Sequence, residues 1–470
     1  MTSSLRSSSE ALRATASENV GVGAAARSLG GGTRRSSETK WRRFGGLTRI
    51  SWALIDQCIV SAANFLTIYL FARHLETALF GAFILAYTGL QLVTSMQNAL
   101  LIQPHNVLGA GLPLAEYRKF TGALIWMQAI SCAVICAVFC IISVMVARVH
   151  SPAAGNVILA LGIAVVPSMG REFARRVLYT RGEARPATFN DGVSYGLQVL
   201  GAFALARFWA DRTTPEAALF VLGASSLAGV LVGAWQLRGH ACFTQAGVRS
   251  VMRTWREVWD FGKWLTGQNA LLWFGGQGHS WLIGLMLGTE QVGLYRAATH
   301  LANIMNPLRQ AAYSYLPSRA SLTYQKNGIG GLLRWVKRIS WTLLLMLLPF
   351  FILLVGFPGP VLSLAYGQRY AGADLALILA LSTIAQCITF SKFPFDIGLL
   401  AQRATRTIFY IHLLPVILLF TAGIGFIHFM GILGVPLSAI LINVALLAAT
   451  WVAYARHSRR NKTIQKLESQ

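Results

Sequence analysis

The sequence predicts an all-α, polytopic membrane protein, with about 12 transmembrane helices in two parallel six-helix lobes around a central cavity. Of its 470 residues, 54% are hydrophobic and only 12% are charged, which is too little charge to cover a soluble protein of this length. Apolar runs of about 20 residues, enough to cross a bilayer core of roughly 30 Å, recur along nearly the whole chain. An internal repeat indicates the two lobes.

The chain begins with a polar segment. Residues 1–46 are rich in Ser, Gly, Ala and Arg, and they contain no apolar run long enough for a signal peptide. We expect a disordered basic tail in the cytoplasm, so that the first membrane span itself serves as the insertion signal.

Apolar segments then follow in two groups. We expect the N-terminal lobe at residues 47–238, a cytoplasmic linker at 239–257, the C-terminal lobe at 258–456 and a cytoplasmic tail at 457–470. Within the linker, Val251 to Trp259 predicts a short amphipathic helix at the membrane surface. The predicted spans are 47–72, 78–103, 120–147, 154–175, 187–207, 216–238, 258–287, 292–316, 339–357, 372–400, 407–428 and 432–456.

The basic residues follow this arrangement. The formal net charge is +24, and 35 of the 41 Lys and Arg residues lie in or beside predicted cytoplasmic segments. The positive-inside rule therefore places both termini in the cytoplasm and accounts for the basic charge without a nucleic-acid partner. Attraction to anionic lipid headgroups is a secondary effect. The other six residues are Arg73, Arg148, Arg207, Arg212, Arg296 and Arg369.

Two segments, Trp52–Phe83 and Trp264–Tyr295, form the internal repeat at an offset of 212 residues. Both are long apolar runs, broken at the same short polar turn and followed by a second apolar run. Each lobe has an even number of spans, so the repeats run parallel, and a substrate is expected between them. The identical pairs are Trp52 and Trp264, Leu70 and Leu282, Leu75 and Leu287, Thr77 and Thr289, and Gly81 and Gly293.

Polar side chains inside the spans predict the substrate cavity, because burying them in lipid is costly. They form stripes on the first, second, seventh and eighth spans, and Gln91 corresponds to Asn303 through the repeat, as Asn98 does to Gln310. Any single Asn or Gln can instead hydrogen-bond a neighbouring helix as interhelical glue. The candidate substrate-binding residues are Asn64, Gln91, Asn98, Gln268, His279, Arg296, His300, Asn303 and Gln310.

Two charged residues have sharper alternatives. Arg296 is either a cation that faces the cavity and binds a phosphate group, or a side chain that snorkels to the membrane interface. Asp56 is either a carboxylate that couples transport to H⁺ or Na⁺, or a carboxylate that forms an ion pair, for example with Arg49.

Cys132, Cys136 and Cys140 share a helix face with no His or carboxylate, so we expect no metal site. We also expect no cofactor and no catalytic residue.

Two motifs, ARHLETALFGAFILAY at 72–87 and LMLGTEQVGLYRAATHL at 285–301, resemble the multidrug/oligosaccharidyl-lipid/polysaccharide exporter superfamily, and within it the bacterial polysaccharide flippase branch. The pattern is a leucine, usually a glycine, a short polar turn, then Phe or Val, a glycine and an aromatic residue. The second copy has all of it as Leu287, Gly288, Val292, Gly293 and Tyr295, whereas the first has Glu76 in place of a glycine.

This resemblance implies a flippase that moves undecaprenyl-diphosphate-linked oligosaccharide units across the bacterial inner membrane by alternating access. Its partners would be the lipid-linked oligosaccharide, the bilayer, and the polymerase and export proteins of the pathway. A multidrug or cation antiporter of the same superfamily is the first alternative, and it should have an acidic cavity. A membrane polymerase or glycosyltransferase is the second, but the short predicted outer loops leave no room for its catalytic segment. A scaffolding subunit without transport is the third.

Overall fold

A computed structural model describes residues 35–109, 112–210, 213–238, 248–370, 372–402 and 404–468, with the side chains of 35–51 and of a few other positions left out. The chain divides into two compact units, 1–51 and 52–470, and the contacts reported below lie within the second. The described residues are helical or irregular, and none of them forms a strand. The all-α prediction is therefore confirmed.

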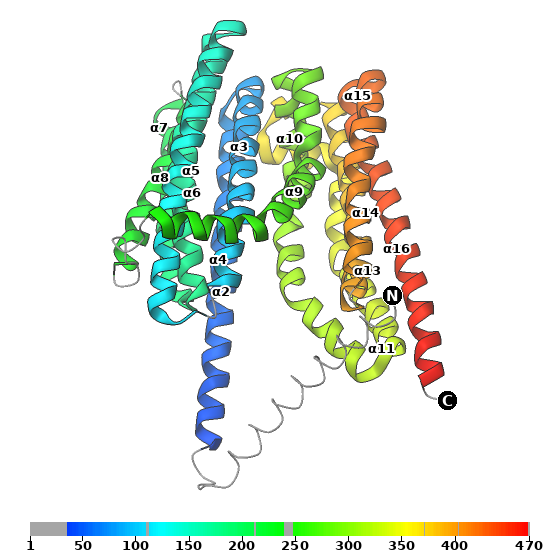
Figure 1. Ribbon diagram of the computed structural model, residues 1–470. Coiled ribbons are helices and arrows are strands. Elements are labelled where there is room, and N and C mark those ends of the chain that lie inside the picture. The colour runs from blue at the N-terminus through cyan, green and yellow to red at the C-terminus, as the bar shows by residue number, and fades with distance from the viewer. Residues whose placement is uncertain are drawn as a thin grey trace, which may run out of the picture. The chain divides into compact units, whose positions relative to one another are not determined.

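The N-terminal lobe consists of α-helices that are joined by short connections (Figure 1). One of its membrane spans is built from three pieces, because α3 passes through a π-helical turn, η2, into α4. The helices are α2 (Arg35–His74), α3 (Thr77–Gln97), η2 (Asn98–Ile102), α4 (Gln103–Leu108), α5 (Leu114–Val149), α6 (Pro152–Thr180), α7 (Ala184–Phe208) and α8 (Pro215–Gln236).

The C-terminal lobe follows the same plan with more interruptions. Its longest helix, α11, is broken at Gly328, which has a φ of 60°. The elements are α9 (Val248–Met286), α10 (Thr289–Ala302), η4 (Asn303–Met305), α11 (Asn306–Gly356), α12 (Pro358–Tyr366), η5 (Gln368–Tyr370), α13 (Ala373–Ala401), α14 (Thr405–Leu418), η6 (Leu419–Gly423), α15 (Ile424–Met430), η7 (Gly431–Leu433) and α16 (Gly434–Glu468).

Every predicted span lies on one or more of these helices, and the polytopic fold is as the sequence predicts. Among the described residues, eight helical segments are long and apolar enough to cross a membrane. The predicted spans at 187–207, 258–287 and 292–316 are not among them. Their helices, α7, α9 and α10, carry polar residues such as Asp191, Gln277 and Arg296, which lower the mean hydropathy. These less apolar spans carry part of the pocket linings described below.

Capping residues explain why several connections are short. Ser151 accepts a hydrogen bond from the backbone nitrogen of Ala154 (3.2 Å) at the start of α6, and Pro152 occupies the first turn. Thr214 caps α8 in the same way through Ala217 (3.3 Å). A hydroxyl cap followed by proline satisfies a free backbone donor and fixes φ for the first turn, so each of these helices has a defined start.

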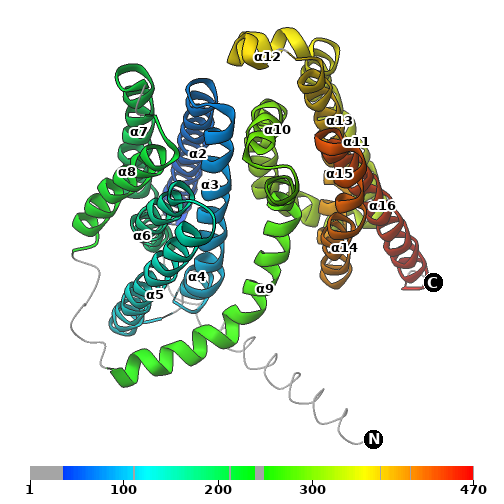
Figure 2. The ribbon, with the colours of Figure 1, turned by 90° about the horizontal axis from the view of Figure 1, so that it is seen from above.

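Helices extend into both the predicted linker and the predicted N-terminal tail, which we did not expect. Helix α9 begins at Val248 and continues without a break into the seventh span, so the segment Val251–Trp259 is not a separate helix. Its Val258 is buried in a cluster with Leu101 and Phe120 of the N-terminal lobe, and Figure 2 shows the start of α9 running across that lobe before it turns. Linker residues 239–247 lie outside the described residues. Helix α2 already starts at Arg35, within the predicted tail, whose residues 1–34 are also outside them.

The lobes meet where α3 and α10 begin. A β-carbon on Gly81 would collide with the carbonyl oxygen of Thr289, and one on Gly293 would collide with that of Thr77. The contact is reciprocal, and its four residues are two of the identical pairs of the repeat. Close backbone approach at small residues is a usual way for membrane helices to pack. The repeated Thr and Gly therefore lie at the contact between the two lobes.

Candidate functional site

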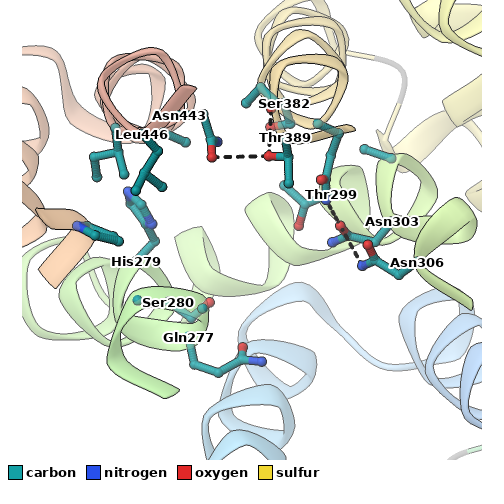
Figure 3. Close-up of a pocket in the computed structure, with 18 of the residues that line it drawn as sticks. Gln277, His279, Ser280, Thr299, Asn303, Asn306, Ser382, Thr389, Asn443 and Leu446 are labelled. Atoms are coloured by element: carbon teal, nitrogen blue, oxygen red, sulfur yellow. Dashed lines mark hydrogen bonds between the residues drawn. The ribbon is translucent and has the colours of Figure 1, made fainter. Parts of the chain in front are cut away.

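A pocket of about 470 Å³ lies within the C-terminal lobe, between α9, α10, α11, α13, α14 and α16. This volume is typical of ligand pockets. Figure 3 shows side chains from these helices converging on it. The polar and charged residues that line it are Gln277, His279, Ser280, Tyr295, Arg296, Thr299, Asn303, Asn306, Arg309, Ser382, Gln386, Thr389, Lys392, His412 and Asn443.

Arg296 is the central cation of this pocket. Its guanidinium donates a hydrogen bond to the side-chain oxygen of Gln277, and its Nε has no hydrogen-bond partner. No carboxylate of the described residues forms an ion pair with it. A partly buried cation without a counter-ion is costly, and a bound anion would remove that cost. This position favours the cavity alternative for Arg296 over snorkelling.

Amide side chains form a second group in the pocket. Asn303 accepts hydrogen bonds from Asn306 (3.1 Å) and from Gln386, and Thr389 donates to Asn443 (3.1 Å; Figure 3). The side-chain oxygen of Asn306 has no partner. Unsatisfied buried polar atoms are uncommon in folded proteins, so their presence along one wall favours a polar ligand at that wall.

The pocket lining is positively charged. Arg309 and Lys392 join Arg296, and no Asp or Glu is among the described residues that line the pocket. Lys392 pairs with Asp396 one turn further along α13 (2.5 Å), whereas Arg309 lies at the start of α11. In a medium of low polarity these charges act over longer distances than in water. The pocket therefore suits an anion.

A second pocket, of about 370 Å³, lies in the N-terminal lobe between α2, α3, η2, α6, α7 and α8. Arg171 donates hydrogen bonds to Ser194 and to the hydroxyl of Tyr195 (both 3.1 Å), and its guanidinium lies 4.3 Å from the ring centroid of Tyr195. The lining residues are Asn64, Tyr87, Leu90, Gln91, Thr94, Ser95, Asn98, Ser168, Arg171, Glu172, Tyr195, Gln198, Leu222 and Ser226.

One hydrogen-bonded chain links the two pockets. Gln277 of α9, which accepts from Arg296, donates to the side-chain oxygen of Gln91 on α3 (3.1 Å). Gln91 lines the N-terminal pocket, and both other residues line the C-terminal one. The pockets therefore adjoin at this bond between the lobes.

The candidate substrate-binding residues divide between these pockets. Six of them line a pocket, His300 and Gln268 do not, and Gln310 cannot be placed. His300 stacks on Phe65 of α2 (ring centroids 4.5 Å apart) and contacts its carbonyl oxygen (3.1 Å), so it packs the lobes together. Gln268 is exposed and lines neither pocket, and the side chain of Gln310 lies outside the described residues. The six are Asn64, Gln91 and Asn98 in one lobe and His279, Arg296 and Asn303 in the other.

Asp56 lies in an ion-paired cluster and lines neither pocket. It is 1% exposed, and it accepts hydrogen bonds from Arg175 (2.9 Å) and from the Tyr179 hydroxyl (2.7 Å). Arg175 also pairs with Asp191 (2.6 Å) and Glu172 (3.1 Å). The counter-ion of Asp56 is thus on α6, whereas the side chain of Arg49 is outside the described residues.

The pocket residues of α6, α7, α8, α13, α14 and α16 were not predicted from the sequence. A signal was present on α13, where Ser382, Gln386 and Thr389 are spaced for one helix face. Arg171 resembled the neighbouring basic residues of a cytoplasmic helix end. Gln277 was missed although it is the residue that joins Gln91 to Arg296.

Comparison with protein families decides the identification. The model of the family "Polysaccharide biosynthesis protein" matches residues 47–314, more than half of the chain. The chain belongs to this family. The match covers the whole N-terminal lobe, the linker and the first two spans of the C-terminal lobe. A comparison with proteins of curated function gives no match.

Solved transporters of the multidrug MATE type share the fold of this family member. An inward-facing multidrug resistance MATE transporter of the MOP superfamily is 12% identical, with a TM-score of 0.70 over 86% of this chain and 96% of that one. An outward-facing multidrug resistance MATE transporter is 11% identical, with a TM-score of 0.61 over 89% of this chain and 96% of that one. A mutant of the Vibrio cholerae MATE transporter VcmN is 14% identical, with a TM-score of 0.60 over 90% of this chain and 98% of that one. The chain is therefore a multi-pass membrane protein of a polysaccharide biosynthesis family, and it has the fold of MATE transporters.

Proposed function

We propose that this protein moves undecaprenyl-diphosphate-linked oligosaccharide units from the cytoplasmic to the periplasmic leaflet of the bacterial inner membrane, with both of its termini in the cytoplasm. The observation that carries the proposal is the C-terminal pocket, where the lining residues that the structure describes include Arg296, Arg309 and Lys392 and no carboxylate. Membership of a polysaccharide biosynthesis family supports the same substrate class. The polymerase and export proteins of that pathway would act on the product.

The chemistry of the pocket fits a diphosphate. A guanidinium presents paired N–H donors that match phosphate oxygens, and Arg296 has its Nε free of a protein partner. Amide groups of Asn303, Asn306 and Gln386 can bond further oxygens of the headgroup. The polyprenyl chain would stay in the lipid, so the pocket has to accept only the polar part.

Alternating access follows from where the lobes touch. The contacts between Gly81 and Thr289 and between Gly293 and Thr77 lie beside the loops that the charge pattern places outside. The hydroxyl of Tyr370 adds a hydrogen bond to the carbonyl oxygen of Ala72 (2.9 Å) at the same end. A closed outer end is what an inward-facing state would have, and the TM-score is higher against an inward-facing transporter (0.70) than against an outward-facing one (0.61), which supports this part of the proposal.

Asp56 is our candidate for coupling transport to H⁺ or Na⁺. Its ion pair with Arg175 means that an incoming cation would compete with a guanidinium inside the N-terminal lobe. Loss of export in Asp56→Asn, at an unchanged amount of protein in the membrane, is the result expected if this carboxylate drives the cycle.

A multidrug or cation antiporter is the second candidate, because the solved structures of the same fold include multidrug transporters. A cationic drug would meet the like charges of Arg296 and Arg309 in the C-terminal pocket, whereas the charge of Lys392 is balanced by Asp396. An antiporter would lower the cellular content of ethidium, and deletion of the gene would raise it. Our proposal expects no change in ethidium content and an accumulation of lipid-linked oligosaccharide on the inner leaflet.

The test of the proposal is Arg296→Ala in cells that lack the native gene. One lost charged hydrogen bond costs about 1.5–3 kcal/mol, so we expect export of polymer to fall roughly ten- to a hundredfold, with lipid-linked units retained inside. Arg148→Ala, at an exposed position on α5, is the matched control and should export normally. Normal export by Arg296→Ala would refute the role of Arg296, and normal export by the deletion strain would refute the function.

A further inference from the structure

The N-terminal pocket differs from the C-terminal one in charge. Among the described residues that line it, only Arg171 and Glu172 are charged, one of each sign, and Glu172 pairs with Arg175 (3.1 Å) and Arg176 (2.7 Å). The guanidinium of Arg171 is engaged by Ser194 and Tyr195. The remaining lining is mostly amide, hydroxyl and tyrosine groups. Such a lining offers little to hold a diphosphate.

We infer that the N-terminal pocket is a carbohydrate subsite that holds the sugars of the substrate, while the C-terminal pocket holds its diphosphate. The inference rests on the proposed function and assigns the two parts of the headgroup to different lobes. Sugar hydroxyls both donate and accept hydrogen bonds, so they match amide and hydroxyl side chains, and the apolar faces of sugar rings pack on aromatic rings.

Asn98 is the residue that points most directly to such a ligand. It lines the pocket, and its side-chain oxygen has no hydrogen-bond partner. It also opens the π-helical turn η2, which runs from Asn98 to Ile102. Turns of this kind inside α-helices are rare and frequently occur at functional sites. A ligand hydroxyl that donates a hydrogen bond to the side-chain oxygen of Asn98 would satisfy this acceptor.

The other polar groups of this pocket are held in fixed positions. Gln198 donates to Thr67 (3.0 Å) and to Asn64 (3.3 Å), which orients the Asn64 amide on the pocket wall. Tyr195 is 7% exposed and is fixed by Arg171, while Tyr87 stacks on Phe83 with ring centroids 5.9 Å apart. A preorganised lining loses little conformational entropy when a ligand binds.

The two subsites are close enough for one headgroup to occupy both. Gln91 belongs to the lining of the N-terminal pocket and bonds Gln277, the residue that holds Arg296 in the other pocket. A diphosphate bonded to Arg296 would therefore have its first sugar beside Gln91. The remaining sugars would extend toward Asn98.

The experiment compares two ligands on the full-length protein in nanodiscs. The first is undecaprenyl diphosphate without sugar, and the second is the lipid-linked oligosaccharide extracted from cells that lack this transporter. We expect Asn98→Leu to weaken binding of the second ligand about tenfold and to leave binding of the first within about twofold. Arg296→Ala should weaken both.

Gln103→Leu is the matched control, since it removes an amide at an exposed position just after η2. It should bind both ligands as the native protein does. Thr94→Val, which removes one hydroxyl from the lining without a change in size, tests the same point if Asn98→Leu does not fold. Equal effects of Asn98→Leu on the two ligands, or none, would overturn the subsite. A native protein that binds neither ligand would overturn the proposed function itself.

Discussion

Arg175 is the residue on which the buried charges of the N-terminal lobe depend. It lies between Asp56 of α2, Asp191 of α7 and Glu172 of its own helix, at distances of 2.9, 2.6 and 3.1 Å. Asp56 and Asp191 are 1% and 0% exposed, so water cannot stabilise their charges. The arginine therefore connects α2, α6 and α7, beside the pocket that Glu172 and Arg171 line.

Two substitutions separate the structural role of this cluster from ion coupling. Arg175→Gln leaves two buried carboxylates without their cation, which costs about 3–5 kcal/mol. We expect a clear fall in the apparent melting temperature in detergent. Asp56→Asn leaves Arg175 paired with Asp191 and Glu172, so its melting temperature should stay close to that of the native protein.

The matched control for Arg175→Gln is Arg176→Gln, because Arg176 is on the same helix, is 35% exposed at its side chain and pairs with Glu172 alone. Its melting temperature should fall much less. Export by Asp56→Asn then decides the coupling. If this stable variant exports polymer normally, also in cells treated with an ionophore, Asp56 is only a structural ion-pair partner.

At the scale of the helices, hydropathy predicts most of the spans, since a helix that crosses lipid must be apolar over a known length, but the spans at 187–207, 258–287 and 292–316 are too polar for hydropathy alone. It was less informative about the pocket walls. Which residues line a pocket depends on the rotation of each helix about its axis and on the helices beside it. Hydropathy reports neither, so it did not predict that Gln268 is exposed or that His300 packs on Phe65. Pairs such as Gln91 and Gln277 come from different lobes, 186 positions apart, and a single sequence does not reveal them.

The close crossing of α3 and α10 predicts that adding a single methyl group at Gly81 destabilises the protein. In Gly81→Ala the added carbon would collide with backbone atoms of Thr289 and Gly293, which cannot rotate away as a side chain could. The helices must separate, so we expect a lower melting temperature and a weaker contact between the lobes.

Gly196→Ala on α7 is the control for Gly81→Ala, because a β-carbon there meets nothing within 4 Å. Alanine favours a helix over glycine by about 1 kcal/mol, so this control should melt at the same temperature or slightly higher. Equal melting temperatures for both variants would show that the reciprocal glycine contact does not hold the lobes together.

For the molecule as a whole, transport requires the closed end to open. Its contacts include the reciprocal glycine crossing, the hydrogen bond from Tyr370 to Ala72 and the packing of Tyr366 on Tyr69, with ring centroids 5.6 Å apart. Each is a small contribution, and an alternating-access cycle needs both states to be populated. Weakening one of these contacts should therefore change the ratio of the two states without unfolding the protein.

Tyr370→Phe tests this directly. It removes one hydrogen bond between the lobes, worth about 0.5–1.5 kcal/mol, and should raise the outward-open fraction roughly two- to twelvefold. Spin labels at Val149 and Phe429, which are 75% and 85% exposed, report the opening as a longer distance between the lobes in a background without native cysteines. Tyr366→Phe is the control, because the hydroxyl of Tyr366 is buried and has no hydrogen-bond partner, so its removal should leave the distance distribution unchanged. If Tyr370→Phe gives the same distribution as Tyr366→Phe, the bond to Ala72 does not hold this end closed, and the crossing of α3 and α10 and the packing of Tyr366 on Tyr69 must do so.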